Sequence, residues 1–190
     1  MTRLALIGTA LLVLGAVLLA SDHVSPLAMD KANRAYLAGD APRALARYEA
    51  IADGWHTRET RIAAAERAAM LDLQAGHDVV AVSRLRQATS LAEGSTKVRL
   101  GQRLADVYAD HFHDHRRAGL ALREAAGVSD DPVLLVKAAR AFERAEAWSD
   151  AGECWTAALP GLAGTTDREE AEAGLLRVAR HSEQASTESE

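Results

Sequence analysis

Three histidines crowd one short stretch near the middle of the chain. In YADHFHDHRRAGLAL, residues 108–122, the imidazoles of His111, His113 and His115 fall within five positions. Imidazole is the commonest metal-binding side chain, and on one continuous helix His111 and His115 would lie on the same face. One hypothesis is therefore a transition-metal site. The alternative is a polar corner, at which one helix ends and the next begins.

Catalytic motifs are otherwise scarce. The sequence contains no glycine-rich phosphate loop, no G-x-S-x-G, no H-E-x-x-H and no C-x-x-C. Its carboxylates stand beside arginines, which is typical of solvated helix faces. The single cysteine, Cys154, cannot form an internal disulfide, and its apolar neighbours predict a small packed residue. We expect a protein that is not an enzyme and that needs no cofactor.

The composition favours helices. Of the 190 residues 48% are hydrophobic, but only 4% are aromatic and four are proline, while alanine, leucine, arginine and glutamate abound. These residues favour closely packed helices over strands. The formal charge of −5, with acidic and basic residues interspersed, gives no basic footprint for nucleic acid. An all-α protein without a nucleic-acid partner is expected.

The first residues have the pattern of a membrane signal. Arg3 precedes an uncharged run over residues 4–20, and Asp22 follows it. A spanning helix needs roughly 17–25 apolar residues, whereas a secretory signal uses roughly 7–15. We predict an uncleaved anchor over residues 1–21 and a linker over residues 22–27, with a cleaved signal peptide as the alternative.

The charges that flank this run predict its orientation. A basic residue before the run and none directly after it favour an N-terminus inside the cell and the remaining chain outside. In a bacterium this is a single-pass protein of the inner membrane with its main domain in the periplasm. After cleavage of a signal peptide the domain would be free in the periplasm.

Beyond the linker, a helix-pair pattern repeats. Alanines recur in the second helices with steps of 37, 37 and 33 residues, at Ala44, Ala81, Ala118 and Ala151. Three of the first helices carry an alanine 12 residues earlier, at Ala32, Ala69 and Ala139. Asp106 takes that place in the third copy. Such periods are typical of helix-pair solenoids, in which small residues let helix axes approach and stacking buries the apolar faces.

The best-defined copy carries a family resemblance. Its pattern is Gly39-Asp40, then Ala44, Tyr48 and Ile51, and it recurs at Gly76, Ala81, Leu85 and Ala88. This resembles the tetratricopeptide repeat (TPR), over roughly residues 28–159. The third copy, with GLALREAAG, also resembles Sel1-like repeats, which match more weakly.

The resemblance implies a fold. It predicts a right-handed α-solenoid of about four antiparallel helix pairs over residues 28–181, with a C-terminal capping helix in REEAEAGLLRVARH. The uncharged run adds one transmembrane helix before this fold. The polar, acidic tail over residues 182–190 is expected to be disordered. Trp55 and Trp148, in the connections between helices, are expected to wedge adjacent helices together.

The resemblance also implies a function, which is binding a protein or peptide in a groove lined by first helices. Helix phase selects six candidate residues for this groove: Asn33, Tyr36, Arg61, Arg67, Arg103 and Arg140. We expect a membrane-anchored periplasmic adaptor that aids the assembly or stability of an envelope complex. The alternative is a periplasmic metal-handling or metal-insertion accessory protein that uses His111, His113 and His115.

The repeat register bears on these histidines. His113 falls where Gly39 and Gly76 stand in the first two copies, so His111 would end one helix and His115 would begin the next. A turn between them would remove the shared helix face, and histidine is among the residues that tolerate a left-handed backbone. The register favours a polar corner, and the metal site stays open as the alternative.

Overall fold

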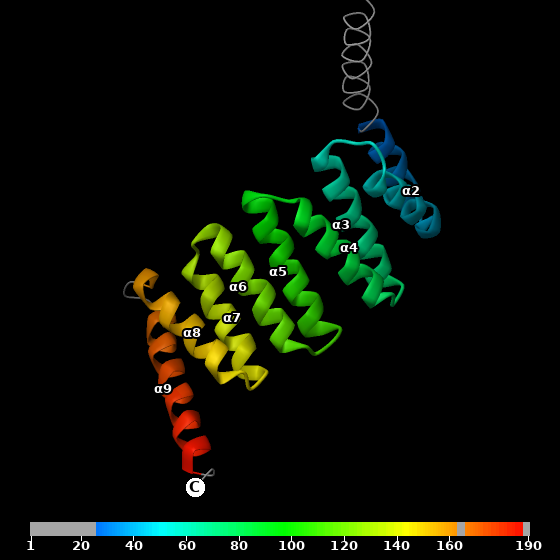
Figure 1. Ribbon diagram of the computed structural model, residues 1–190. Coiled ribbons are helices and arrows are strands. Elements are labelled where there is room, and N and C mark those ends of the chain that lie inside the picture. Colours follow the sequence, from blue (N-terminus) through cyan, green and yellow to red (C-terminus); the bar gives the residue numbers. More distant parts are fainter. Residues whose placement is uncertain (1–25, 163–165, 188–190) are drawn as a thin grey trace, which may run out of the picture. The chain divides into compact units, whose positions relative to one another are not determined.

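The computed structural model describes residues 26–162 and 166–187, and within these ranges the chain is helical without strands. After a first helical segment over residues 26–37, the elements are α2 (Ala41–Asp53), α3 (Arg58–Gln74), α4 (Asp78–Leu91), α5 (Gly94–Asp110), α6 (His115–Ser129), α7 (Pro132–Arg144), α8 (Trp148–Ala158), the 3-10 turn η1 (Leu159–Gly161) and α9 (Thr166–Thr187) (Figure 1). This confirms the all-α prediction for the described residues. The chain divides into two compact units, with the boundary between Ala92 and Glu93.

Unit 1 consists of two helix pairs, the segment 26–37 with α2 and then α3 with α4. Its core is built from small side chains, because Ala32, Ala44, Ala69 and Ala81 are all fully buried. Alanine at these positions lets the helix backbones approach closely. Larger side chains, among them the buried Tyr48 and Leu85, lie four residues after the second-helix alanines and fill the remaining space.

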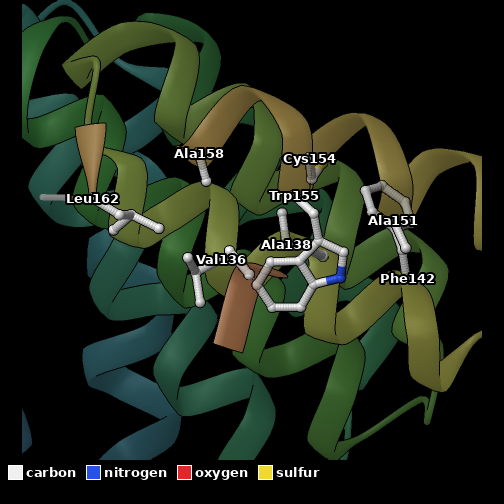
Figure 2. Packing of buried hydrophobic residues seen from close by; sticks show 10 residues of the cluster. Val136, Ala138, Phe142, Ala151, Cys154, Trp155, Ala158 and Leu162 are labelled. Carbon is white, nitrogen blue, oxygen red and sulfur yellow. The ribbon is translucent and has the colours of Figure 1, made fainter. Parts of the chain in front are cut away.

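Unit 2 contains the pairs α5–α6 and α7–α8, followed by α9. Figure 2 shows part of its core, in which the indole of Trp155 lies among the small and apolar side chains of α7 and α8. Helix α9 packs on α8 and brings Gly174 against this indole. A Cβ at Gly174 would lie 2.4 Å from Trp155 Cε2, so only glycine allows this approach. Helix α9 therefore has the position of the predicted capping helix.

The turns that join the helices of the four described pairs share one backbone feature. One residue in each turn has a positive φ, as glycine readily does: Gly39, Gly76, His113 and Glu146. A backbone N–H just beyond it reaches back to the preceding helix, from Asp40 to the Ala35 carbonyl at 3.0 Å and from His77 to the Asp72 carbonyl at 2.8 Å. Such bonds satisfy carbonyls that a helix end would otherwise leave unpaired.

The third turn is one residue longer than the others. The Asp114 N–H bonds the carbonyl of Tyr108, six residues back, whereas Asp40, His77 and Ala147 each bond a carbonyl five residues back. The extra residue shifts the first helix of this pair by one position. Ala105 is therefore the buried small residue and Asp106 is exposed. The assignment of Asp106 to the small position was wrong, because the constant spacing of 12 does not hold in this copy.

Two predicted boundaries differ from the helices that the structure describes. The first helical segment includes residues 26 and 27, which we had assigned to the linker, and α9 continues through residues 182–187 of the predicted tail. Alanine, glutamate and glutamine are good helix formers, which allows the helix to continue into this polar sequence.

The predicted anchor over residues 1–21 lies outside the described residues. Among the residues that the structure does describe, none of the helices combines the length and the apolar character needed to cross a bilayer.

Candidate functional site

Three of the predicted groove residues come together in unit 1. Tyr36, from the segment 26–37, and Arg67, from α3, line a pocket of about 170 Å³. Asn33 lies beside them and is bonded to Arg67. The other lining residues are Tyr48, Met70, Leu71 and Gln74. We call this pocket and Asn33 the unit 1 groove.

Helix geometry explains why these side chains share one surface. Asn33 and Tyr36 are three residues apart, and so are Arg67 and Met70, which places each pair on a single helix face. Ala32 and Ala69 are buried directly beside these faces and allow the two first helices to approach the second helix. Tyr48 reaches the groove from α2, and its buried ring forms part of the wall.

The amide of Asn33 is held by two donors. The Tyr48 hydroxyl donates to Asn33 Oδ1 at 2.8 Å, and the guanidinium of Arg67 donates to the same oxygen. Arg67 also lies over the Tyr48 ring, with its Cζ atom 6.0 Å from the ring centroid. These contacts fix Asn33 and Arg67 in place, as a preformed binding surface requires.

The groove combines exposed apolar surface with one positive charge. Tyr36 is 47% exposed and Met70 is 38% exposed. Within the part of the chain that the structure describes, Arg67 bonds a neutral amide and forms no ion pair with a carboxylate. Its charge therefore remains available to an acidic group or a carbonyl of a ligand. The volume is below the roughly 300–1,000 Å³ of small-molecule sites and suits a single side chain.

Arg61, the fourth candidate in unit 1, has a structural contact. Its Nε donates to the carbonyl of Ala52 at 2.9 Å, near the end of α2. This bond ties α3 to a carbonyl that α2 leaves without a helical partner. Arg61 is not among the residues that line the unit 1 groove.

Arg140 in unit 2 is bound by the capping helix. Its Nε donates to Glu170 Oε1 of α9 at 2.6 Å, and its Nη2 bonds the second oxygen of the same carboxylate. This bidentate hydrogen bond raises the pKa of Arg140 and lowers the pKa of Glu170. Arg140 therefore ties α7 to α9.

Arg103 lies on α5, near a carboxyl group with a perturbed pKa. Partial burial and the neighbouring Asp110 raise the pKa of Asp106, while Lys137 and Arg103 oppose the rise. Asp106, Lys137 and Arg140 also line a second pocket, of about 370 Å³, between α5 and α7. This pocket carries both signs of charge, and Arg103 is not part of its lining.

The three histidines form the predicted corner. His111 caps the C-terminus of α5, His113 has φ 51°, and His115 is the first residue of α6. The Asp114 side chain accepts the N–H of Arg117 at 2.9 Å and so caps α6. Among the described residues, no group of three or more histidine, cysteine or acidic side chains could hold a metal ion. The geometry gives the metal alternative no support.

Cys154 is a packed residue, as expected from the sequence. Its side chain is buried in the unit 2 core, and burial raises the pKa of the thiol to about 11. A thiol with so high a pKa carries little thiolate at neutral pH and is a poor nucleophile.

The two tryptophans in the connections behave differently. Trp148 stacks on His181 of α9, with ring centroids 3.7 Å apart, and so joins α8 to α9 as predicted. Trp55, between α2 and α3, is 91% exposed. The prediction that Trp55 wedges two helices together was wrong, because Gly54 directs the chain away from the end of α2 in an extended conformation.

A buried ion pair in unit 1 was not predicted. Asp72 of α3 is almost fully buried and accepts a hydrogen bond from Arg84 Nε at 2.6 Å, while Arg84 also bonds Glu49 of α2. The sequence offered two signals for this ion pair: Arg84 on α4, and Asp72 on a mainly apolar face of α3. Met70 was also missed, although it lies one helical turn after Arg67.

The comparison with solved structures bears on the fold. No family model matches the sequence, and the search of curated proteins found no match. Two crystal structures of a Podosopora anserina putative kinesin light chain with nearly identical TPR-like repeats each have a TM-score of 0.51. They are 15% and 16% identical to this chain. The matched regions cover 84% and 85% of this chain, and 87% and 89% of the two solved chains. The crystal structure of MamA has a TM-score of 0.47 at 15% identity, with coverage of 82% of this chain and 96% of that one. The chain has a TPR-like repeat fold.

Proposed function

We propose that this protein is a membrane-anchored adaptor that binds a segment of a partner protein in the unit 1 groove. The TPR-like repeat fold supports protein interaction as its general role, since helix-pair repeats present extended binding surfaces. The observation that carries the proposal is the preformed groove itself. It places the exposed Tyr36 and Met70 beside Arg67, whose charge has no carboxylate partner in the described residues.

The chemistry of the groove defines the kind of segment that it binds. One apolar side chain of the ligand enters the pocket between Tyr36 and Met70. An acidic side chain or a backbone carbonyl next to it accepts a hydrogen bond from Arg67. Burial of the apolar side chain supplies most of the affinity, while the charged hydrogen bond selects the sequence.

The location forms the second part of the proposal. The uncharged run over residues 4–20 anchors the chain in the bacterial inner membrane, and the repeat fold stands in the periplasm. There it holds a partner within or beside an envelope complex and aids the assembly or stability of that complex. The protein carries out no chemistry of its own.

Purification of the full chain from membranes with its bound protein tests the proposal. Arg67→Met removes the charge from the groove, whereas Arg86→Met makes the same change at an exposed residue of α4 that does not line the pocket. We expect the Arg67→Met variant to lose a partner that the wild type and Arg86→Met both retain. Equal recovery of the partner from all three chains, each folded by circular dichroism, would refute the groove as its site.

A further inference from the structure

A large apolar side chain is exposed to solvent at one end of unit 1. Trp55 is 91% exposed in the short connection between α2 and α3. Indole is an amphipathic ring that favours an environment apolar on one side and wet on the other. Its exposure leaves the ring available for a contact outside the described fold.

The connection holds Trp55 in a defined place. The N–H of Gly54 bonds the Ile51 carbonyl at 3.3 Å, and the Thr57 hydroxyl accepts the N–H of Thr60 at 3.3 Å. The Arg61 bond to Ala52 joins the two helix ends below the connection. A side chain at position 54 would lie 2.6 Å from the Ala50 carbonyl oxygen, so glycine lets the chain turn this tightly. Trp55 is thus exposed on a connection that hydrogen bonds hold in place.

Trp55 lies at the end of unit 1 where the described chain begins. The segment 26–37 and α2 are antiparallel, with Asn33 bonded to Tyr48 and the Lys31 carbonyl bonded to Arg47. Because Asn33 is level with Tyr48, Leu27, six residues before Asn33, is level with Gly54, six residues after Tyr48. Leu27 is 59% exposed. In Figure 1 the connection between α2 and α3 is at the same end of unit 1 as the start of the blue segment.

Chain length ties this end to the uncharged run. Only residues 21–25 separate Ala20 from the described segment, and fully extended they reach about 20 Å. With residues 4–20 in the bilayer, Leu27 is held within about this distance of the lipid surface, and the α2–α3 connection that carries Trp55 is at the same end of unit 1. Tryptophan is enriched in that interfacial layer, which is roughly 5–7 Å thick on each side of the hydrocarbon core.

We propose that Leu27 and Trp55 form a lipid-contacting edge, which inserts into the headgroup layer and sets the orientation of unit 1 on the membrane. The inference rests on the anchor in the proposed function. The charges nearby are mixed, because the exposed Arg58 has Glu59 at 3.9 Å and the exposed Asp53 follows Ala52. The contact therefore depends on apolar insertion, and zwitterionic lipid suffices for it.

This orientation has a consequence for the unit 1 groove. Tyr36 lies nine residues beyond Leu27, which is about 13–14 Å along the helix. With the segment 26–37 directed away from the bilayer, the edge meets the lipid while the groove stays beyond the headgroup layer. A partner segment then reaches the groove without displacing lipid.

A fluorophore at position 55 tests the contact in the full chain, reconstituted in phosphatidylcholine vesicles. Trp55→Cys and Val79→Cys are labelled with an environment-sensitive dye, while Cys154 is buried and unreactive. Val79 is a matched control, because it is 74% exposed but lies at the start of α4, the opposite end of the antiparallel helices. We expect a blue-shifted emission, quenched by spin labels near the headgroups, at position 55 alone.

Native tryptophan fluorescence provides a second measurement without the label. Brominated phosphatidylcholine should quench part of the emission of the wild type, and the Trp55→Phe variant should lose most of that quenching. Water-like emission at both labelled positions, from chains that float with the vesicles, would overturn the edge and leave the anchor intact. Chains that do not float would overturn the anchor and the edge together, while recovery of the groove partner would still be measured independently.

Discussion

His113, in the third turn, carries backbone strain that glycine avoids at the equivalent positions of the first two turns. His113 has φ 51°, close to the region occupied by Gly39 and Gly76. An L-residue in this region costs about 1–2 kcal/mol, and the cost is lower for small polar residues with local hydrogen bonds. The histidines of this stretch therefore mark a helix boundary, and their proximity in sequence does not translate into a shared ligand site.

Replacement of His113 by glycine should stabilise the protein. We expect His113→Gly to raise the free energy of unfolding by about 0.5–1 kcal/mol, because glycine adopts positive φ without strain. His111→Gly is the control, since His111 has φ −96° and glycine there only loses entropy on folding. Urea denaturation measures both. A loss of stability in His113→Gly equal to that in His111→Gly would contradict this account.

The thiol of Cys154 should react slowly while the protein is folded. Its pKa of about 11 lies two units above that of an ordinary thiol of pKa 9.0, so the thiolate fraction at pH 8 is about 100-fold smaller. We expect alkylation by iodoacetamide to be slower by at least this factor in buffer than in urea.

The sign of the linked pH dependence follows from the same shift. The folded state holds the Cys154 proton more tightly than the unfolded state between pH 9 and pH 11. Its contribution to stability is therefore complete below pH 9 and is lost as the pH rises through 11. Equal alkylation rates in the folded and unfolded protein would show that Cys154 is accessible.

At the scale of elements, close contacts between helices depend on glycine and alanine at particular places. Helix α9 docks on α8 through Gly174 and Trp155, and Glu143 of α7 accepts bonds from both the Trp155 indole and Arg177 of α9. The indole N–H is therefore satisfied although the ring is buried.

A methyl group at position 174 should loosen the cap. Gly174→Ala places a Cβ 2.4 Å from the Trp155 ring, and overpacking of this kind costs about 1–3 kcal/mol. Gly127→Ala on α6 is the matched control, because nothing lies within 4 Å of its added Cβ. That variant should gain about 0.5–1 kcal/mol from helix propensity. Equal and small effects in urea denaturation would mean that α9 does not pack on Trp155.

Sequence periodicity predicted the elements better than their exact register. The alanines at second-helix positions are buried in all four copies, because a small residue is needed wherever two helices cross closely. The longer third turn was not predictable from spacing, since Ala105 and Asp106 are neighbours and only the fold decides which one faces the core. The ion pair of Arg140 was missed for a related reason. Its carboxylate partner comes from α9, whose docking position depends on long-range packing.

At the scale of the whole molecule, our proposals assign partner binding to the unit 1 groove and membrane attachment to residues 1–21. Helix phase alone selected Asn33, Tyr36 and Arg67, which the fold brings together, because each side chain follows the face beside a buried alanine. Their mutual hydrogen bonds required the tertiary structure. The anchor over residues 1–21 stays a prediction from hydropathy and charge, and the lipid-contacting edge extends it to the first residues of the described fold.

Photo-crosslinking from the unit 1 groove tests the central claim most directly. A photoreactive phenylalanine analogue at position 36 keeps the ring of Tyr36, and the same analogue at position 86 samples the exposed surface of α4. In membranes that contain the full chain, we predict one defined protein adduct from position 36, none from position 86, and loss of the adduct when Arg67→Met is added. The same adduct from both positions, or an adduct from position 36 that persists without Arg67, would contradict the proposed groove.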